Sequence, residues 1–164
     1  MTLLPWEQRP VELANLLNPA FCSLLLQDAI NGYHSHASQS LPYPLAYLML
    51  PIVLYPPARA ALPRSTAALL PAWLQEHPAL QIQVADRVTR MRAYSREAIL
   101  FGLQHNLLQV SDDGELESRN KQVKQLFPPQ TEPADCRKAA GLVGRWFGKV
   151  ADGSLILTLW GLKP

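Results

Sequence analysis

The sequence predicts a mainly helical protein of the α+β class: a helical domain with a winged helix-turn-helix-like module and a small β-sheet. Residues 56–94 are helix-rich and are divided by prolines into short stretches. Residues 107–118 contain two strand-like runs around an Asp-Asp-Gly turn of the kind that closes tight hairpins. A predicted helix directly precedes this hairpin, and helix, strand, turn and strand is the order of elements at the end of a winged helix.

The chain of 164 residues is long enough for one well-cored domain and too short for two independent domains of ordinary size. We therefore expect a single domain over residues 1–164. Its helical N-terminal part is expected at about residues 1–94 and its winged-helix-like part at about residues 95–164.

The first well-defined element is a helix at about residues 19–33. Asn18 suits the N-cap position, and Pro19 follows at the first helical position, where its missing N–H is not needed. Leu24 and Leu26 make the helix apolar on more than one side, which predicts a central position in the fold.

Between Asp28 and Arg59 the chain has no Asp, Glu, Lys or Arg, and residues 41–55 in this stretch are strongly apolar. They are interrupted by prolines and are fewer than the roughly 20 apolar residues that a membrane span needs. We therefore expect a buried helix. Because isolated small domains rarely leave large apolar patches exposed, the stretch also predicts that a partner covers part of the surface.

The next region is expected to contain three short helices. The first lies at about residues 57–61, the second ends near residue 77, and the third lies at about residues 78–91. Pro63, Pro71 and Pro78 separate them, because proline is tolerated at a helix start and is costly in a helix interior.

Residues 95–119 form the winged-helix-like module. Ser95 can cap a helix that starts at Arg96, and Glu97 in the first turn suits the positive end of the helix dipole. The helix carries an apolar stripe of Ile99, Leu100, Leu103 and Leu107.

The C-terminal part predicts a helix at about residues 134–150 and then a strand. Gly141, Gly144 and Gly148 give that helix a face that another helix can approach closely. Residues 153–164 are apolar on both faces, which favours a terminal strand that is buried in a sheet or paired with a partner chain.

The charge of the module argues against base-specific DNA reading. Residues 95–108 contain one arginine and no lysine, whereas a recognition helix needs several basic or polar side chains. Phosphates would also repel the three acidic residues at the hairpin tip.

Residues 1–57 have a net charge of −2 and the remainder +4, so any anion-binding surface is expected in the C-terminal two-thirds. The candidate nucleic-acid contacts are the basic residues after the second strand, Arg119, Lys121 and Lys124, which a solvated charged face explains equally well.

No sequence motif predicts catalysis, a metal site or a cofactor site. The chain lacks a GxxxxGK[ST] loop, GxGxxG after a strand, HExxH and GxSxG. Cys22 and Cys136 lack CxxC spacing, and His34 and His36 have no third ligand, so buried reduced thiols and solvated histidines are expected. The start of the chain does not read as a signal peptide, which favours a cytoplasmic protein without membrane association.

Six segments in this order resemble the middle component of bacterial three-component ABC-ATPase conflict systems, a family long listed as a domain of unknown function. They are "NPAFCSLLLQDAINGY", "YPLAYLMLPIVLY", "ALPRSTAALLPAWLQEHP", "REAILFGLQHNLL", "AAGLVGRWFGKV" and "LTLWGLKP". The resemblance runs from about residue 18 to residue 164. It implies a large partner ATPase similar to SMC and Rad50 proteins, in systems that defend against phage or other invading DNA. The family has no assigned catalytic residues.

The resemblance and the apolar stretches favour a non-enzymatic adaptor that bridges the ABC ATPase and a third system component, and the analogy with small winged-helix subunits also allows a homodimer. The alternative is a winged-helix DNA-binding protein or transcriptional regulator. A membrane-associated accessory protein would rest on residues 41–55 alone. The candidate partner interface consists of six large apolar residues, Leu48, Ile52, Leu54, Trp146, Phe147 and Trp160.

Overall fold

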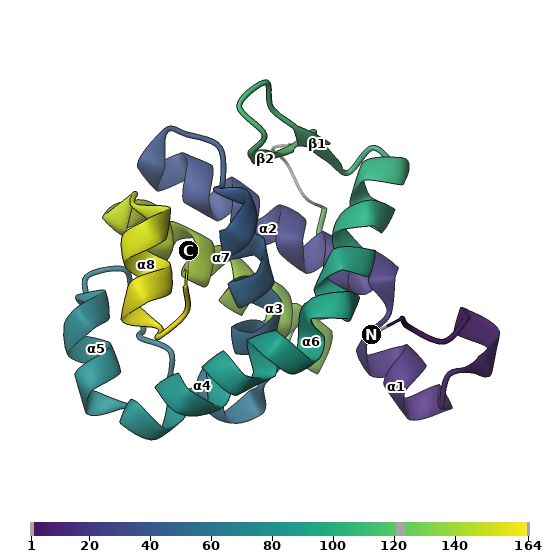
Figure 1. Cartoon of the computed structure of the whole chain (residues 1–164), viewed down its shortest axis with the longest axis horizontal. Coiled ribbons are helices and arrows are strands. Elements are labelled where there is room, and N and C mark those ends of the chain that lie inside the picture. The colour runs from purple at the N-terminus through teal and green to yellow at the C-terminus, as the bar shows by residue number, and fades with distance from the viewer. Residues whose placement is uncertain (1, 121–123, 164) are drawn as a thin grey trace.

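The computed structural model describes residues 2–120 and 124–163, and within them the fold is mainly helical with a small antiparallel sheet (Figure 1). The fold class predicted from the sequence is therefore confirmed. In chain order the elements are η1 (Trp6–Gln8), α1 (Val11–Leu16), α2 (Pro19–Ala37), η2 (Tyr43–Leu45), α3 (Ala46–Val53), α4 (Pro56–Ala61), α5 (Leu70–Glu76), α6 (Pro78–Gln104), β1 (Leu108–Val110), β2 (Leu116–Ser118), α7 (Glu132–Val150) and α8 (Gly153–Leu159).

The long helices α2 and α7 pack closely against each other and form the centre of the fold. Asn18 caps α2 as predicted, because its Oδ1 accepts hydrogen bonds from the backbone N–H groups of Ala20 at 2.9 Å and Phe21 at 3.4 Å. A Cβ at Gly144 would overlap the carbonyl oxygen of Ala29, and one at Gly148 would lie 2.5 Å from that of Tyr33. The predicted glycine face of α7 therefore brings the two helix backbones into direct contact.

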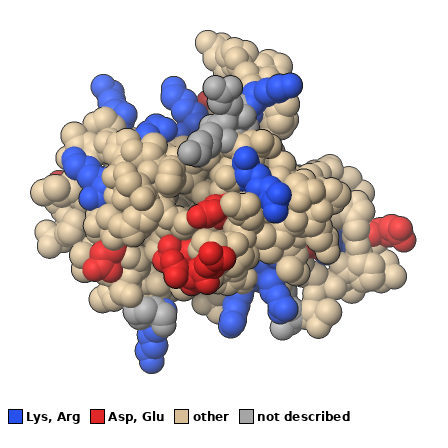
Figure 2. All heavy atoms as spheres, turned by 90° about the horizontal axis from the view of Figure 1, so that it is seen from above, with Lys and Arg blue, Asp and Glu red and all other residues tan. Residues whose placement is uncertain are grey.

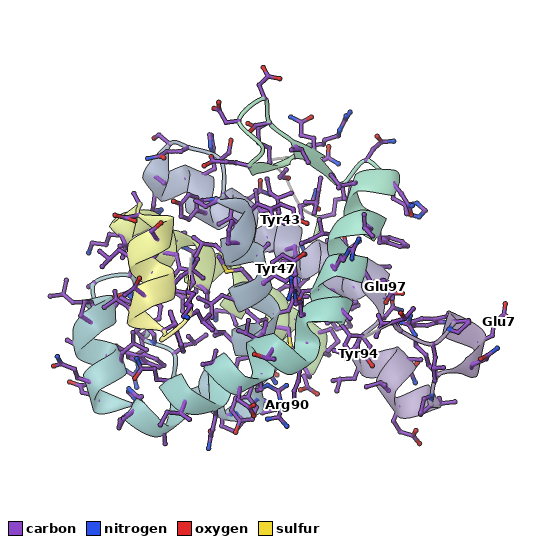
Figure 3. All side chains as sticks on the ribbon, viewed as in Figure 1. Glu7, Tyr43, Tyr47, Arg90, Tyr94 and Glu97 are labelled. Carbon is purple, nitrogen blue, oxygen red and sulfur yellow. The ribbon has the colours of Figure 1, made fainter. Side chains whose placement is uncertain are left out.

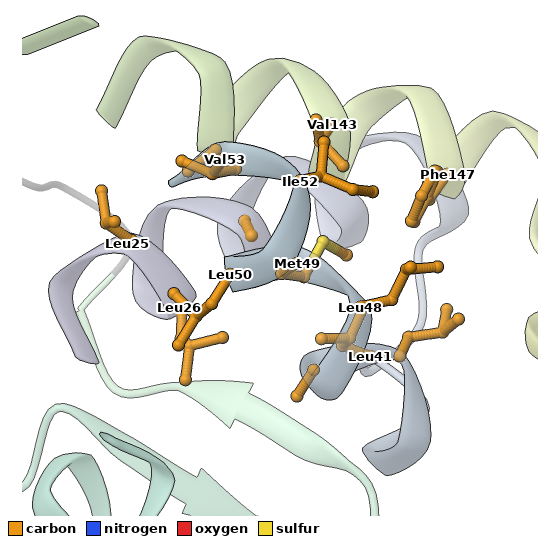
Figure 4. Close-up of a cluster of buried hydrophobic side chains, with 14 of the residues drawn as sticks. Leu25, Leu26, Leu41, Leu48, Met49, Leu50, Ile52, Val53, Val143 and Phe147 are labelled. Carbon is orange, nitrogen blue, oxygen red and sulfur yellow. The ribbon is translucent and has the colours of Figure 1, made fainter. Parts of the chain in front are cut away.

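Helix α3 is the buried helix predicted for residues 41–55. It is short and includes Pro51 in its interior, and its side chains fill the space in front of α2 and α7 (Figure 4). Leu48, Met49 and Ile52 of α3 are almost completely buried, and Val143 and Phe147 of α7 belong to the same cluster of buried side chains. The uncharged stretch thus forms protein interior.

The predicted hairpin is present as β1 and β2, with Val110 opposite Leu116. Gly114 in the turn adopts a φ of 81°, which glycine allows without strain. Leu41 and Leu116 exchange two backbone hydrogen bonds of 2.9 Å each, which attach the hairpin to the segment before α3. Hydrogen bonds from Ser40 and Gln109 hold the pKa of Glu117 in β2 below its usual value.

The helix predicted to start at residue 96 is not a separate element. Helix α6 runs without interruption from Pro78 to Gln104, so the expected boundary between residues 94 and 95 falls inside it. Ser95 is completely buried in the helix interior and is not a cap. The reason is a buried stripe that continues across the expected break, through Met91, Ser95, Ala98, Ile99 and Gly102. Helix and hairpin therefore follow in the order of a winged helix, but no turn precedes residue 95.

The predicted terminal strand is wrong, because residues Gly153–Leu159 form helix α8. Asp152 caps this helix through a hydrogen bond of 2.9 Å from the N–H of Leu155 to its Oδ1. Ile156 and Trp160 are buried at helical spacing, whereas Leu155 is exposed. An apolar run of this length is ambiguous between strand and helix, and here the cap and the spacing of the buried side chains correspond to a helix.

Candidate interaction site

The N-terminal arm, which we define as residues 2–17 with η1 and α1, extends from one side of the body (Figure 1). Arg9 attaches it to α6, because its Nη1 and Nη2 donate to the two carboxylate oxygens of Glu97 at 2.7 and 2.6 Å. Glu97 and Tyr94 lie on the side of α6 that faces the arm (Figure 3). The guanidinium also lies 5.9 Å from the ring centroid of Tyr94 and 5.5 Å from that of Trp6. The hydrogen bond to Glu97 raises the pKa of Arg9.

The arm exposes large apolar side chains. Four of them, Leu4, Trp6, Val11 and Leu16, are between 43 % and 69 % exposed. Single exposed apolar residues are common on protein surfaces, but a group on one short projecting segment is typical of a surface that binds another protein.

A groove of about 800 Å³ lies beside the arm, and we call it the apolar groove. Its walls come from α1, α2, the end of α6 and the segment before α7. Phe21 and Phe127 meet edge to face with ring centroids 5.6 Å apart, which fixes the two walls relative to each other. The large apolar side chains of the lining are Leu16, Phe21, Leu24, Leu54, Phe101, Leu107, Leu126 and Phe127.

The polar groups of the apolar groove lie mainly at its rim. Arg59 donates to Glu132 Oε1 at 2.8 Å and to the carbonyl oxygen of Val53 at 2.8 Å, so its charge is paired. Glu12 has no ion-pair partner among the described residues, which leaves the rim with negative charge. Cys136 lies in the lining, and burial raises the pKa of its thiol. The apolar lining and the unpaired carboxylate of Glu12 suit an apolar segment of another protein that has a basic residue beside it.

The six residues predicted as a partner interface lie in the core. Leu48, Ile52, Leu54, Trp146, Phe147 and Trp160 are at most 6 % exposed. The indole N–H of Trp146 donates to the carbonyl oxygen of Ala68 at 2.7 Å, and its ring meets Trp73 edge to face. Packing inside the chain explains their strongly apolar character, and of the six Leu54 alone also lines the apolar groove.

Of the predicted nucleic-acid contacts, Arg119 and Lys124 are exposed, and Lys121 lies outside the described residues. Asp112 and Asp113 are exposed at the hairpin tip. Figure 2, which looks onto the hairpin end of the molecule, shows a group of acidic atoms near the centre of this face, with Lys and Arg atoms both close beside it and nearer the edge.

Cys22 and Cys136 are buried free thiols, as expected, and burial raises the pKa of Cys22 to about 12. His34 and His36 are exposed. Within the described residues, no group of three His, Cys, Asp or Glu side chains is placed to hold a metal ion.

One helical stretch, Val11–Ala37, is long and apolar enough by composition to cross a membrane. Half of its most apolar window is buried inside the fold, and the core helix of a soluble protein meets the same criterion. The stretch includes α2, whose buried side faces α7, α6 and α3.

A family model described as ABC-three component (ABC-3C) system Middle Component 3 matches residues 6–164. No curated protein and no solved structure matches the chain.

Proposed function

The chain belongs to the Middle Component 3 family of ABC-three component systems, and from this membership we propose that it is a non-enzymatic adaptor subunit. It bridges the SMC- or Rad50-like ABC ATPase of its system and the third component. We place this role in a cytoplasmic defence against phage or other invading DNA.

The observation that carries the proposal is the apolar surface formed by the N-terminal arm and the apolar groove. The volume of about 800 Å³ exceeds what one side chain can fill, and aromatic side chains line it. Exposed apolar surface of this kind favours association with another protein, because association removes apolar area from water.

The proposed occupant is an amphipathic helix or extended segment of the ABC ATPase. Its apolar residues would lie in the apolar groove, and a basic residue would lie near Glu12 at the rim. The arm would form one wall of the complex, because Leu16 belongs both to the arm and to the lining.

Co-expression with the other two components of the system, followed by affinity purification, tests this function. Leu16→Asp and Leu126→Asp place a charge at exposed positions of the lining, so both variants are expected to fold and to lose most of the co-purified ATPase. Ile82→Asp is the matched control, since Ile82 is 70 % exposed on α6 and does not line the apolar groove. The proposal fails if the wild-type chain never co-elutes with the ATPase, or if all three variants bind it equally.

The adaptor role is preferred to that of a base-reading winged helix. Asp112 and Asp113 would bring negative charge to the phosphates at the tip of a wing. The start of α6 lies seventeen residues before Ser95, so the segment that precedes the hairpin is the end of a long helix and not a short recognition helix.

Cytoplasmic residence is part of the same proposal. The protein is expected in the soluble fraction of lysed cells without detergent. Recovery in the membrane pellet, and release only by detergent, would contradict it.

A further inference from the structure

A second surface feature, which we call the basic furrow, lies between α2 and α7 on the outer side of this helix pair. It has a volume of about 410 Å³. Its charged and polar lining consists of Asp28, Asn31, Ser35, Arg137, Lys138 and Arg145. The adaptor proposal assigns no role to these residues.

The floor of the basic furrow is backbone. A Cβ at Gly32 would overlap the carbonyl oxygen of Gly141, and it would lie 3.0 Å from the backbone nitrogen of Arg145. The helices therefore touch directly beneath the charged side chains. This contact fixes the spacing of the cations on α7 relative to the polar residues on α2.

The acidic residue of the basic furrow is already paired. Arg137 donates to the two carboxylate oxygens of Asp28 at 2.7 and 3.1 Å, and both side chains are nearly buried. Lys138 and Arg145 have no ion-pair partner among the described residues. The furrow therefore presents a net positive charge to solvent.

Two of the basic residues singled out in the sequence lie beside the basic furrow. The side-chain amide of Asn31 donates to the carbonyl oxygen of Asn120 at 3.0 Å, which places Arg119 next to α2. Arg137 Nη1 donates to the carbonyl oxygen of Lys124 at 2.7 Å, which places that residue next to α7.

The spacing of these cations suits a row of phosphates. Lys138 and Arg145 are seven residues apart on α7, two helical turns or roughly 10 Å. Arg64 adds a cation beyond Lys138, because the two residues line a second hollow of about 610 Å³, whose lining also includes the acidic Asp135.

The lining of the basic furrow distinguishes a nucleic acid from an acidic protein segment. Protein interfaces depend on large apolar or aromatic anchors at their centre. The furrow has glycine, serine, asparagine and charged residues and none of these anchors. Phosphate binding needs only such long cationic side chains and polar donors.

We propose that the basic furrow, together with Arg119 and Lys124, binds the phosphate backbone of nucleic acid without reading its sequence. Long flexible cations on an outer helix face neutralise phosphates, whereas base reading requires an element inserted into a groove of the duplex. This inference is independent of the adaptor proposal.

The test is a salt titration of binding to a fluorescent mixed-sequence 30-base-pair DNA duplex by the full chain. Four phosphate contacts predict a slope of log affinity against log salt of about −3 to −4. Lys138→Gln with Arg145→Gln is expected to weaken binding by about tenfold at low salt and to reduce the slope by about 2. The matched control is Arg92→Gln with Arg96→Gln, which removes the same charge from two exposed positions on α6.

The proposal is supported if the furrow variant loses affinity, the control variant keeps it, and duplexes of unrelated sequence bind equally. Three results would overturn it: no binding by the wild-type chain at 20 to 50 mM salt, where phosphate contacts are strongest; equal losses in both double variants; or displacement of the duplex by poly-glutamate of the same total charge. The last result would assign the basic furrow to an acidic protein.

Discussion

Arg9 in the N-terminal arm and Glu97 in α6 form a bidentate ion pair across 88 residues of sequence, at 2.7 and 2.6 Å. The side chain of Arg9 is 5 % exposed and that of Glu97 is 30 % exposed. Arg9 Nε also donates to the carbonyl oxygen of Leu4 at 2.8 Å, so one guanidinium organises the arm and attaches it to the body. The position of one wall of the apolar groove therefore depends on this pair.

Arg9→Ala is expected to loosen the arm without unfolding the body. The change leaves the Glu97 carboxylate without its partner and costs about 2 kcal/mol of arm attachment, which corresponds to a roughly 30-fold faster exchange of the amide hydrogens in α1. Hydrogen exchange followed by mass spectrometry measures it.

Arg90→Ala is the control for the arm prediction, because Arg90 pairs with Asp86 on the exposed surface of α6 and such pairs contribute about 0 to 1 kcal/mol. Exchange in α1 should not change in this variant. If Arg9→Ala also leaves α1 fully protected, then the ion pair does not hold the arm.

The contact between α2 and α7 makes a second prediction at two glycines of one helix. Gly144→Ala forces a Cβ into the carbonyl oxygen of Ala29 and is expected to lower the free energy of unfolding by about 1 to 3 kcal/mol. Gly141→Ala meets only the flexible end of Arg145 at 3.3 Å, and alanine favours the helix by about 1 kcal/mol over glycine. The two substitutions should thus change the free energy of unfolding in opposite directions, which urea denaturation measures. Equal losses of this free energy would contradict the close approach at Gly144.

The sequence identified the helices best where their ends carry cap residues or prolines. Asn18 and Pro19 marked the start of α2, and Pro78 marked the start of α6. The boundary inside α6 was wrong because Ser95 is a good cap in isolation, and only the tertiary contacts of the buried stripe show that the helix continues. The cap of α8 at Asp152 was readable in the sequence, but the apolar run after it resembled a strand.

The candidate site could be predicted less well than the fold. Large apolar residues such as Trp146 and Phe147 occur both in protein cores and in interfaces, so residue type does not distinguish the two locations. Only the burial of each side chain in the structure does. The arm was missed because its attachment depends on a contact between residues far apart in sequence. Its one local signal is that Arg9 is the single Lys or Arg among the first 57 residues.

Burial of Cys22 predicts a loss of stability in alkaline solution. Burial raises the pKa of this thiol from about 9 to about 12, so between these values the unfolded chain ionises while the folded chain stays protonated. The contribution of this thiol to the free energy of unfolding is fully present below about pH 9 and is lost as the pH rises toward 12.

Cys22→Ala removes this pH dependence. Relative to the variant, the wild-type chain should lose about 1 kcal/mol more of its free energy of unfolding between pH 8 and pH 10. Urea denaturation at the two pH values measures the difference. Parallel pH profiles would mean that the thiol ionises as easily in the folded chain as in the unfolded one.

Ser95 and Asn18 offer a direct comparison between an apparent and an actual helix cap. Ser95 is completely buried within α6, and its Oγ has no hydrogen-bond partner among the described residues. Ser95→Ala is therefore expected to leave the free energy of unfolding unchanged or to raise it, because it removes a buried polar group that gains nothing from folding. Asn18→Ala is expected to lower it by about 1 kcal/mol, because two backbone N–H groups of α2 lose their acceptor. Thermal and urea unfolding of the two variants measure both effects, and a loss of about 1 kcal/mol at Ser95 would show that its hydroxyl does support the helix.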